Sequence, residues 1–337
     1  MVTRIRTRLI HGLVVSVVGA LAWGLAPAAF AQNKTLLRIS TPAVPDDWHA
    51  KMWTVFKDTL DKTAPNQFEV QIHLNATLFK QGAEPAAMAR GNLELASISA
   101  FDIAKQVPAF SVFTVPYVVR DVQHQQKVFA SPVVAPLLKS VSEQMDVTVL
   151  GAAYLGTRQL SLREPRAVKT PDDLKGLKLR MPGSKEWLFL GNALGATATP
   201  LAFGEVYLGL KTGTIDAQDN PLPTVRAAKF YEVSKQVVLT QHLVDALFIS
   251  VANKTWQSLN ASQQQAVRQA AQAAVKFNNE QRSQEEAQVV AFLKQQGLQV
   301  STPDVAAFRQ RVQAVYTDSE MAKTWPEGLI DRIQSVR

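Results

Sequence analysis

The sequence predicts an α/β protein of two domains, and three observations carry this prediction. The chain has 337 residues, which is too many for one small core and suits two domains of ordinary size. Strand and helix patterns alternate over the first hundred residues, as in parallel sheets with right-handed crossovers. A helical pattern near the C-terminus covers residues 258–297. About 36 helical residues would span roughly 54 Å, which is long enough to lie across both domains.

Composition indicates a folded globular chain and excludes cysteine chemistry. Hydrophobic residues make up 47% of the chain and charged residues 19%, as in ordinary globular proteins. The chain has no cysteine, so disulfides, thiolate metal sites and thiol catalysis are excluded. The formal charge of +8 is dispersed along the sequence. Nucleic-acid binding usually needs a clustered basic stripe, so we expect no nucleic-acid partner.

The N-terminus has the pattern of a secretory signal peptide over residues 1–31. A basic region with three arginines precedes an apolar run over residues 13–25, and Ala29-Phe30-Ala31 forms an A-x-A cleavage site. The alternative is a retained membrane anchor, which the short apolar run disfavours. We therefore expect an exported protein located in the periplasm.

Strand and helix patterns of the first half place one lobe at residues 32–156, completed by residues 246–257. Apolar spacing close to the helical period predicts a helix at 48–63, and period-two alternation predicts a strand at 68–74. Gly156-Thr157-Arg158 interrupts the strand at 147–154, so we place the first crossing between lobes there. The other elements expected in this half are strands at 36–41 and 93–99, an irregular connection at 107–119, and helices at 84–90, 121–130 and 132–145.

The second lobe is assigned to residues 157–245 and is organised around residues 174–221. A short apolar-basic strand at 177–180 is followed by Ser184, a predicted helix N-cap. The lobe-spanning helix at 258–297 begins at an Asn260 cap and stops at Gly297. Residues 298–337 are expected to form C-terminal helices that pack on the lobes. The remaining elements expected in this half are helices at 222–231, 305–316 and 326–333, and strands at 236–240, 247–252 and 298–301.

No known catalytic or metal-binding motif occurs in the sequence. The chain has no G-x-S-x-G, H-E-x-x-H, P-loop or G-x-G-x-x-G motif. No two of its five histidines share metal-ligand spacing, and each is expected to be an ordinary surface or core residue. We therefore expect no catalytic residues, no metal and no cofactor. The five histidines are His11, His49, His73, His124 and His242.

Arg180 is the strongest candidate for a ligand-binding residue. It ends an apolar strand four residues before the predicted N-cap Ser184, and open α/β folds bind ligands beyond the carboxyl ends of strands. A guanidinium can hold a carboxylate through two parallel hydrogen bonds, and a helix N-terminus adds partial positive charge. The alternative is a surface arginine paired with Asp or Glu, and spacing alone does not decide between the two.

Other candidates each have an ordinary structural alternative. Arg158 follows a strand and is placed in a loop, Gly-Thr-Arg-Gln, where a solvated arginine is the ordinary expectation and a ligand contact the alternative. Asn220 can bond an anion through its amide or form an Asx-turn. The aromatic residues Phe203, Trp187 and Trp48 suit the walls of a pocket or a plain core.

Several longer motifs cover most of the chain. The most extended are Asp173-Leu-Lys-Gly-Leu-Lys-Leu-Arg180, Phe203-Gly-Glu-Val-Tyr207 and Asp216-Ala-Gln-Asp-Asn-Pro221, with a shorter Gly156-Thr-Arg-Gln159. Together they resemble the signature of the solute-binding proteins of tripartite ATP-independent periplasmic (TRAP) transporters, of the dicarboxylate- and sialic-acid-binding type. The resemblance implies a two-lobe periplasmic binding protein fold with a long helix spanning both lobes. It also implies a ligand in the cleft between the lobes.

The resemblance also implies roles for individual residues. Arg180 matches the family's carboxylate-binding arginine and Arg158 the second arginine of the sialic-acid type. Asn220 matches an asparagine that holds the same carboxylate, and Phe203 the aromatic residue beside it. Ser99 ends the strand where the family reads the far part of the ligand. Trp48, Phe101 and Trp187 complete the expected substrate-binding set.

The expected function is capture of a carboxylate-containing organic acid and its delivery to a TRAP-type, ion-gradient-driven membrane permease. Ser99 and Pro42 differ from the sialic-acid type, which argues against sialic acid itself. A C4-dicarboxylate, an aromatic or keto acid and a sugar acid all stay open. The partners expected are this small anion and the permease subunits, with the binding protein itself a monomer. The alternatives are an extracytoplasmic ligand sensor and an enzyme acting on an organic acid.

Overall fold

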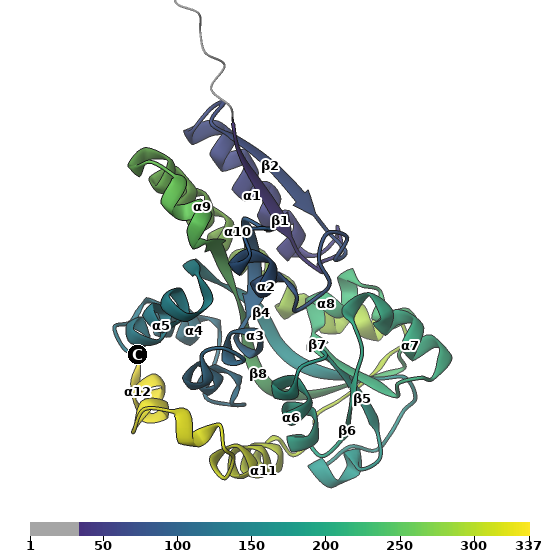
Figure 1. Cartoon of the computed structure of the whole chain (residues 1–337). Helices are drawn as coiled ribbons and strands as arrows, with labels where there is room; N and C mark the ends of the chain where they lie inside the picture. Colours follow the sequence, from purple (N-terminus) through teal and green to yellow (C-terminus); the bar gives the residue numbers. More distant parts are fainter. Residues whose placement is uncertain (1–33) are drawn as a thin grey trace, which may run out of the picture. The chain divides into compact units, whose positions relative to one another are not determined.

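A computed structural model describes residues 34–337, which form one compact unit. The predicted signal peptide and its cleavage site lie outside the described residues. One continuous sheet runs through the unit in the order β2-β1-β3-β8-β4-β7-β5-β6, with β9 beside β8 (Figure 1). Its strands are β1 (Thr35–Ser40), β2 (Phe68–His73), β3 (Leu95–Ser99), β4 (Val147–Leu162), β5 (Lys178–Met181), β6 (Thr197–Pro200), β7 (Ala217–Pro221), β8 (Gln236–Ala252) and β9 (Gln299–Ser301).

The first three strands have the parallel arrangement that the sequence predicts. Strand β1 pairs in parallel with both β2 and β3, and α1 connects β1 to β2 while α2 connects β2 to β3. The helices of the described chain are α1 (Trp48–Thr63), α2 (Glu84–Ala89), α3 (Ala100–Ala104), α4 (Val122–Ala130), α5 (Ala135–Met145), α6 (Lys185–Ala193), α7 (Val206–Thr212), α8 (Leu222–Ala227), α9 (Asn253–Ser258), α10 (Ala261–Gln295), α11 (Val305–Thr317) and α12 (Leu329–Ser335).

Strands β4 and β8 correct the expected strand boundaries. The strand expected at 147–154 continues to Leu162, and the two strands expected at 236–240 and 247–252 are one strand, β8. The antiparallel pair β4–β8 passes the expected break through register shifts, one of them between Tyr154 and Gly156. Gly156 has φ of 124°, and a Cβ there would lie 2.5 Å from the Cβ of Pro221. A bulge with a close backbone approach therefore replaces the predicted loop.

Helix α10 matches the predicted long helix. Its 35 residues begin at an Asn260 capping box. The N-terminal half packs on α1 through Ala270, Ala274 and their neighbours, in a core that contains Trp53. The C-terminal half contributes Val289 and Leu293 to a separate core that contains residues of α7 and α8. The helix thus joins two hydrophobic cores, while the lobe boundaries within β4 and β8 stay predictions.

Smaller differences have local causes. The helix expected at 222–231 ends at Ala227, because Lys229 adopts a left-handed conformation with φ of 56° before a short 3-10 turn. Helices α3 and α9 were not expected, since each is too short to show a periodic pattern. The N-cap Ser184 is confirmed by the bond that its hydroxyl accepts from the Trp187 N–H.

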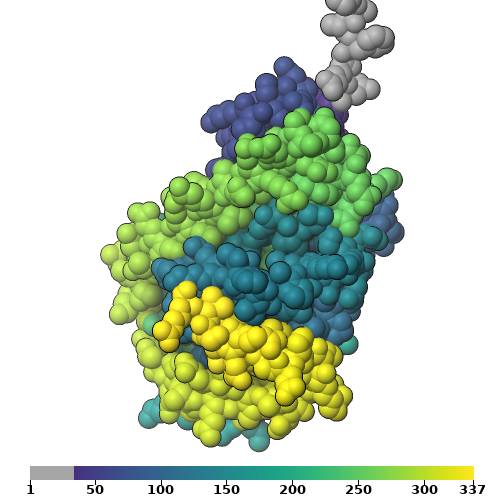
Figure 2. Space-filling model, turned by 90° about the vertical axis from the view of Figure 1, so that its left-hand side faces the viewer, coloured from purple at the N-terminus to yellow at the C-terminus, as the bar shows by residue number. Residues whose placement is uncertain are grey.

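The C-terminal segment lies across one face of the molecule, where Figure 2 shows it in yellow. Tyr316 of α11 packs edge-on against Phe189 of α6. Arg120 donates to the carbonyls of Gln334 and Val336. The segment therefore contacts elements from both halves of the sequence. Within residues 34–337 no helix is long and apolar enough to cross a membrane.

Candidate functional site

One cavity brings together most of the residues expected to bind a ligand. It encloses about 720 Å³ of empty space, part of it open to solvent. Its walls come from the segment after β1, the start of α1, the end of β3, the middle of β4 and the ends of β5 and β7. The predicted site residues that line it are Arg180, Arg158, Asn220, Phe203, Ser99 and Trp187.

Arg180, on β5, is a buried cation in this cavity. Its side chain is 1% exposed. The Nε atom donates to the Leu201 carbonyl over 2.8 Å, and Nη2 donates to Oε1 of Gln81 over 3.1 Å. No carboxylate of the described chain forms an ion pair with Arg180. Burial and the nearby Arg158 lower its pKa to about 9, against the opposing attraction of Asp219 and Glu205, so the group is still charged at neutral pH.

Arg158 differs, because protein carboxylates already surround it. Its Nε atom donates to Oδ1 of Asp219 over 2.5 Å, and Nη1 donates to Oδ2 of Asp245 over 2.8 Å. The structure also corrects its setting, since Arg158 lies within strand β4 and not in a loop. Burial alone would raise the pKa of Asp219, but Arg158 and His242 lower it below its ordinary value. Arg158 is thus a structural ion-pair centre with one side toward the cavity.

Asn220 and two aromatic rings complete this end of the cavity, which we call the arginine end. The Asn220 amide donates to Oε1 of Gln218 over 2.6 Å. The Phe203 ring lies 5.9 Å from the guanidinium carbon of Arg180, and the Trp187 ring lies 4.7 Å from that of Arg158. Cations over aromatic faces are favourably placed, so both rings stabilise the two arginines.

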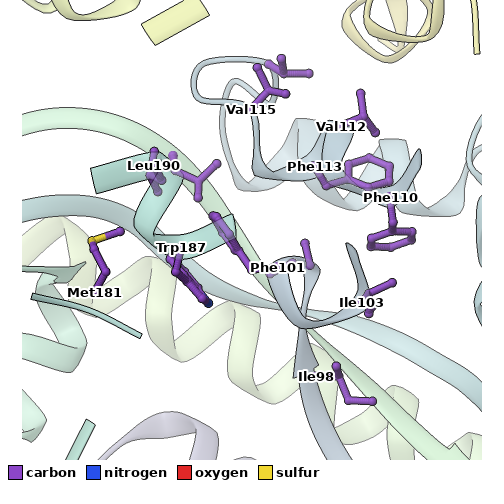
Figure 3. Close-up of a cluster of buried hydrophobic side chains, with 14 of the residues drawn as sticks. Ile98, Phe101, Ile103, Phe110, Val112, Phe113, Val115, Met181, Trp187 and Leu190 are labelled. Atoms are coloured by element: carbon purple, nitrogen blue, oxygen red, sulfur yellow. The ribbon is translucent and has the colours of Figure 1, made fainter. Parts of the chain in front are cut away.

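Phe101 supports the site from behind and does not line it. Its ring is fully buried and stacks on Trp187, with centroids 3.5 Å apart and planes 12° from parallel. Figure 3 shows this pair in the hydrophobic cluster that also contains Phe110 and Phe113. Trp187 is therefore fixed on one face by Phe101 while it contributes to the cavity wall.

Trp48 lies outside this cavity, in contrast to its expected place in the site. Its indole N–H donates to Glu285 of α10, and its ring packs edge-on against Phe277. The Lys51 ammonium lies over the Trp48 ring, 4.2 Å from its centroid. Trp48 opens α1, and its neighbour His49 lines the cavity instead.

Acidic and hydroxyl groups form the wall contributed by β3, α2 and α3. Ser99 caps α3 by accepting the Asp102 N–H, and its hydroxyl donates to Oδ2 of Asp102 over 2.7 Å. Glu84 accepts the Gly82 N–H over 2.7 Å. Burial, reinforced by Asp102, raises the pKa of Glu84 to about 7, although the Gly82 bond and Lys105 oppose this.

A second buried ion pair adjoins the cavity at the start of α1. Asp47 caps α1 through the His49 N–H and pairs with Arg282 of α10. The Thr224 hydroxyl of α8 donates to Oδ2 of Asp47 over 3.2 Å, and Arg282 Nη1 donates to the Leu155 carbonyl over 2.6 Å. This group ties α1, α8, α10 and β4 together beside the ligand cavity.

Sequence reasoning missed several lining residues, among them Gln81, His49, Glu84, Asp102 and Asp245. The sequence did hold a signal for two nearby acidic residues. Asp219 lies within the motif Asp216-Ala-Gln-Asp-Asn-Pro221, and Asp47 directly precedes a predicted helix, where a capping residue is expected. Gln81 sits in a short irregular stretch, and Glu84 opens the short helix α2; neither position carries a pattern that reveals its orientation. Within residues 34–337 no cluster of three metal-ligating side chains occurs.

Residues 40–323 match the family of bacterial extracellular solute-binding proteins, family 7. A TRAP periplasmic solute-binding protein from Roseobacter denitrificans, solved with bound 3-deoxy-D-manno-oct-2-ulosonic acid, is 42% identical with a TM-score of 0.87, over 90% of this chain and 100% of that chain. The sialic acid-binding periplasmic protein SiaP of Vibrio cholerae is 29% identical over 294 residues, 87% of this chain and 91% of that protein.

Another TRAP solute-binding protein, from Polaromonas and bound to D-erythronate, is 26% identical with a TM-score of 0.84, over 90% of this chain and 99% of that chain. These likenesses confirm the fold class predicted from the sequence, the α/β two-lobe binding-protein fold with a long helix spanning both lobes.

Proposed function

Because the chain belongs to the bacterial extracellular solute-binding proteins of family 7, the binding proteins of TRAP transporters, we propose that it captures a sugar acid outside the cytoplasm and delivers it to a TRAP membrane permease. Members of this family bind solutes and are not enzymes. The proposed location is the periplasm, reached after cleavage of the signal peptide at residues 1–31.

The buried charge of Arg180 is the observation that carries the proposal. A buried guanidinium without an ion-pair partner is costly, and a ligand carboxylate would supply that partner. Arg180 already commits Nε and Nη2 to neutral acceptors, which orient the planar group toward the cavity. Hydrogen bonds to charged groups contribute roughly 1.5–3 kcal/mol each. Arg180 and Asn220 are therefore proposed to bind the carboxylate, with Arg158 held beside them by Asp219 and Asp245.

The remaining walls favour a hydroxylated ligand over a purely apolar one. Ser99, Asp102 and Glu84 offer oxygen acceptors for ligand hydroxyl groups along one wall. The relatives described above were found with, or are named for, acids rich in hydroxyl groups: 3-deoxy-D-manno-oct-2-ulosonic acid, sialic acid and D-erythronate. A sugar acid with one carboxylate matches both the arginine end of the cavity and the wall that carries Ser99, Asp102 and Glu84.

Delivery would depend on closure of two lobes around the ligand. We propose lobe 1 at residues 32–156 with 246–257 and lobe 2 at residues 157–245, joined within β4 and β8 and by α10. Ligand contacts on both lobes would favour the closed arrangement, which the permease would recognise. The bond between Gln81 and Arg180 already crosses this proposed boundary.

A thermal-shift screen of the mature chain against organic acids tests the proposal. We expect 3-deoxy-D-manno-oct-2-ulosonic acid and related sugar acids to raise the unfolding temperature, because a ligand that binds only the folded state stabilises it. Matched neutral sugars lacking the carboxylate are expected to have no effect. Equal stabilisation by the neutral sugars would contradict the proposal. So would a screen in which no acid raises the unfolding temperature.

A further inference from the structure

His49 is a buried polar side chain in the cavity wall with no protein partner for its ring. The side chain is 2% exposed and lines the cavity. Neither ring nitrogen forms a hydrogen bond within residues 34–337; the Tyr154 carbonyl lies near the ring but outside hydrogen-bond geometry. Buried polar atoms are normally hydrogen-bonded, and leaving one unpaired is energetically costly.

The protonation state of His49 suits the recognition of hydroxyl groups. Burial and the positive charge of Arg282 lower the pKa of His49 to about 3, although Asp47 opposes this. The ring is therefore neutral at physiological pH, with one nitrogen donating and the other accepting. A hydroxyl group also donates and accepts, so it matches this ring, whereas a carboxylate only accepts. Ser97, whose buried hydroxyl likewise has no partner, lines the same cavity from β3.

Glu84 is the acidic group in this cavity that no cation neutralises. Asp47 pairs with Arg282, Asp245 with Arg158, and Asp102 with Lys105. Glu84 is 4% exposed and forms no ion pair within the described chain. Its carboxyl group accepts the Gly82 N–H, which leaves acceptor capacity for a ligand hydroxyl. With its pKa near 7, Glu84 is only partly charged at neutral pH. A ligand carboxylate beside it would meet like charge where Glu84 is ionised, and elsewhere would have to hold Glu84 in its protonated form.

We propose that His49 and Glu84 are specificity-determining residues that accept a polyhydroxylated monocarboxylate and reject a second carboxylate. This inference rests on the proposed function, because it takes the arginine end as the site of the single carboxylate. It selects sugar acids from the ligand classes that the sequence left open and excludes C4- and longer dicarboxylates.

Four acids distinguish the roles of the two residues when their affinities are measured by isothermal titration calorimetry on the mature chain. The probes are 3-deoxy-D-manno-oct-2-ulosonic acid, D-gluconate, hexanoate and adipate, the last three sharing a six-carbon chain. Wild-type protein is expected to bind the two hydroxylated acids at least tenfold more tightly than hexanoate and adipate.

His49→Phe removes both ring nitrogens and keeps a ring of similar size. The substitution is expected to lower the affinity for the better-bound hydroxylated acid at least tenfold. The affinity for hexanoate is expected to stay within threefold of the wild-type value. His73→Phe is the matched control, because Nε2 of His73 is also buried without a partner but His73 does not line the cavity. If His49→Phe does not fold, His49→Ala carries the same expectation, and His49→Asn is expected to recover most of the affinity.

Glu84→Gln removes the ionisable carboxyl group at nearly constant shape. In this variant the ratio of the affinity for the hydroxylated acid to the affinity for adipate is expected to fall at least tenfold relative to wild type. Glu186→Gln is its control, since Glu186 is equally buried but lies outside the cavity lining. Unchanged preferences in either His49→Phe or Glu84→Gln would overturn the inference while leaving the proposed function intact. Failure of every acid to bind wild-type protein would instead contradict the proposed function, and the inference with it.

Discussion

Nη2 of Arg180 donates a hydrogen bond to Oε1 of Gln81 over 3.1 Å, although the two residues lie 99 positions apart in the chain. The same oxygen accepts the Phe203 N–H over 3.3 Å. Gln81 therefore links the segment before α2 to β5 and to the turn after β6. The cation proposed to bind the ligand is thus also part of a bridge across the cavity.

Replacing Arg180 is expected to abolish binding without unfolding the protein. Arg180→Ala removes the buried charge and both donors, and we expect at least a hundredfold loss of sugar-acid affinity. Arg180→Lys keeps the charge but loses the planar bidentate geometry, so a smaller loss is expected. Calorimetric titration measures both, with circular dichroism to establish folding. Near-native affinity in a folded Arg180→Ala variant would show that Arg180 does not bind the ligand carboxylate.

Loss of the bridge is expected to open the cavity. Gln81→Ala removes the acceptor shared by Arg180 and the Phe203 N–H, so the ligand-free protein is expected to populate a more open arrangement of the proposed lobes. Small-angle X-ray scattering should show a larger radius of gyration than wild type without ligand. Gln71→Ala, a change on the exposed side of β2, serves as the control. An unchanged radius in Gln81→Ala would show that this bond does not hold the lobes together.

The buried ion pair of Arg158 is expected to stabilise the fold strongly. Both side chains of the Arg158–Asp219 pair are at most 3% exposed, and removing one partner of a buried pair costs about 3–5 kcal/mol. Asp219→Ala should lower the free energy of unfolding in urea by this amount. The exposed pair Lys235–Glu164 offers a control, since solvent screens surface ion pairs and Glu164→Ala is expected to change the free energy of unfolding far less than Asp219→Ala. Equal effects of the two substitutions would contradict the buried-pair account.

His49 is expected to make the protein sensitive to acid. Its pKa falls from the ordinary 6.5 to about 3 on folding, so its contribution to stability is complete above pH 6.5 and is lost as the pH falls. At pH 5 the loss is about 2 kcal/mol, at 1.36 kcal/mol per pH unit. The charged groups near the ring are Arg282 and Asp47.

Urea unfolding at pH 7 and pH 5 measures this effect. His49→Phe cannot take up the proton, so it should lose less stability between the two pH values than wild type. The other histidines are common to both proteins and cancel in the comparison. Parallel losses in the two proteins would mean that His49 is accessible to protons in the folded state.

Much of the fold could be predicted because its patterns are local. The parallel β1–β2–β3 arrangement, the Ser184 cap and the long helix α10 all follow from periodicity and capping residues. That β4 and β8 are continuous strands could not be predicted, because a bulge at Gly156 looks the same as a loop in the local sequence. Its partner strand, which keeps the chain extended, comes almost a hundred residues later.

The site divides in the same way between local and distant information. Arg180 was a candidate from its place at a strand end beside a helix cap, and the resemblance to the family favoured a ligand contact over a surface arginine. The sequence could not show that His49 lines the cavity while Trp48 lies outside it. The two residues are adjacent at the start of a helix, and their different surroundings depend on how α10 packs there. Arg158 was predicted as a ligand contact, but the acidic partners that surround it lie in β7 and β8.

A crystal structure of the mature chain with 3-deoxy-D-manno-oct-2-ulosonic acid tests the central claim most directly. We predict that the ligand carboxylate lies within 3.2 Å of the Arg180 guanidinium, a normal charged hydrogen-bond distance, with its hydroxyl groups toward His49 and Glu84. A ligand bound in this cavity with its carboxylate away from Arg180, or bound elsewhere on the protein, would contradict the account.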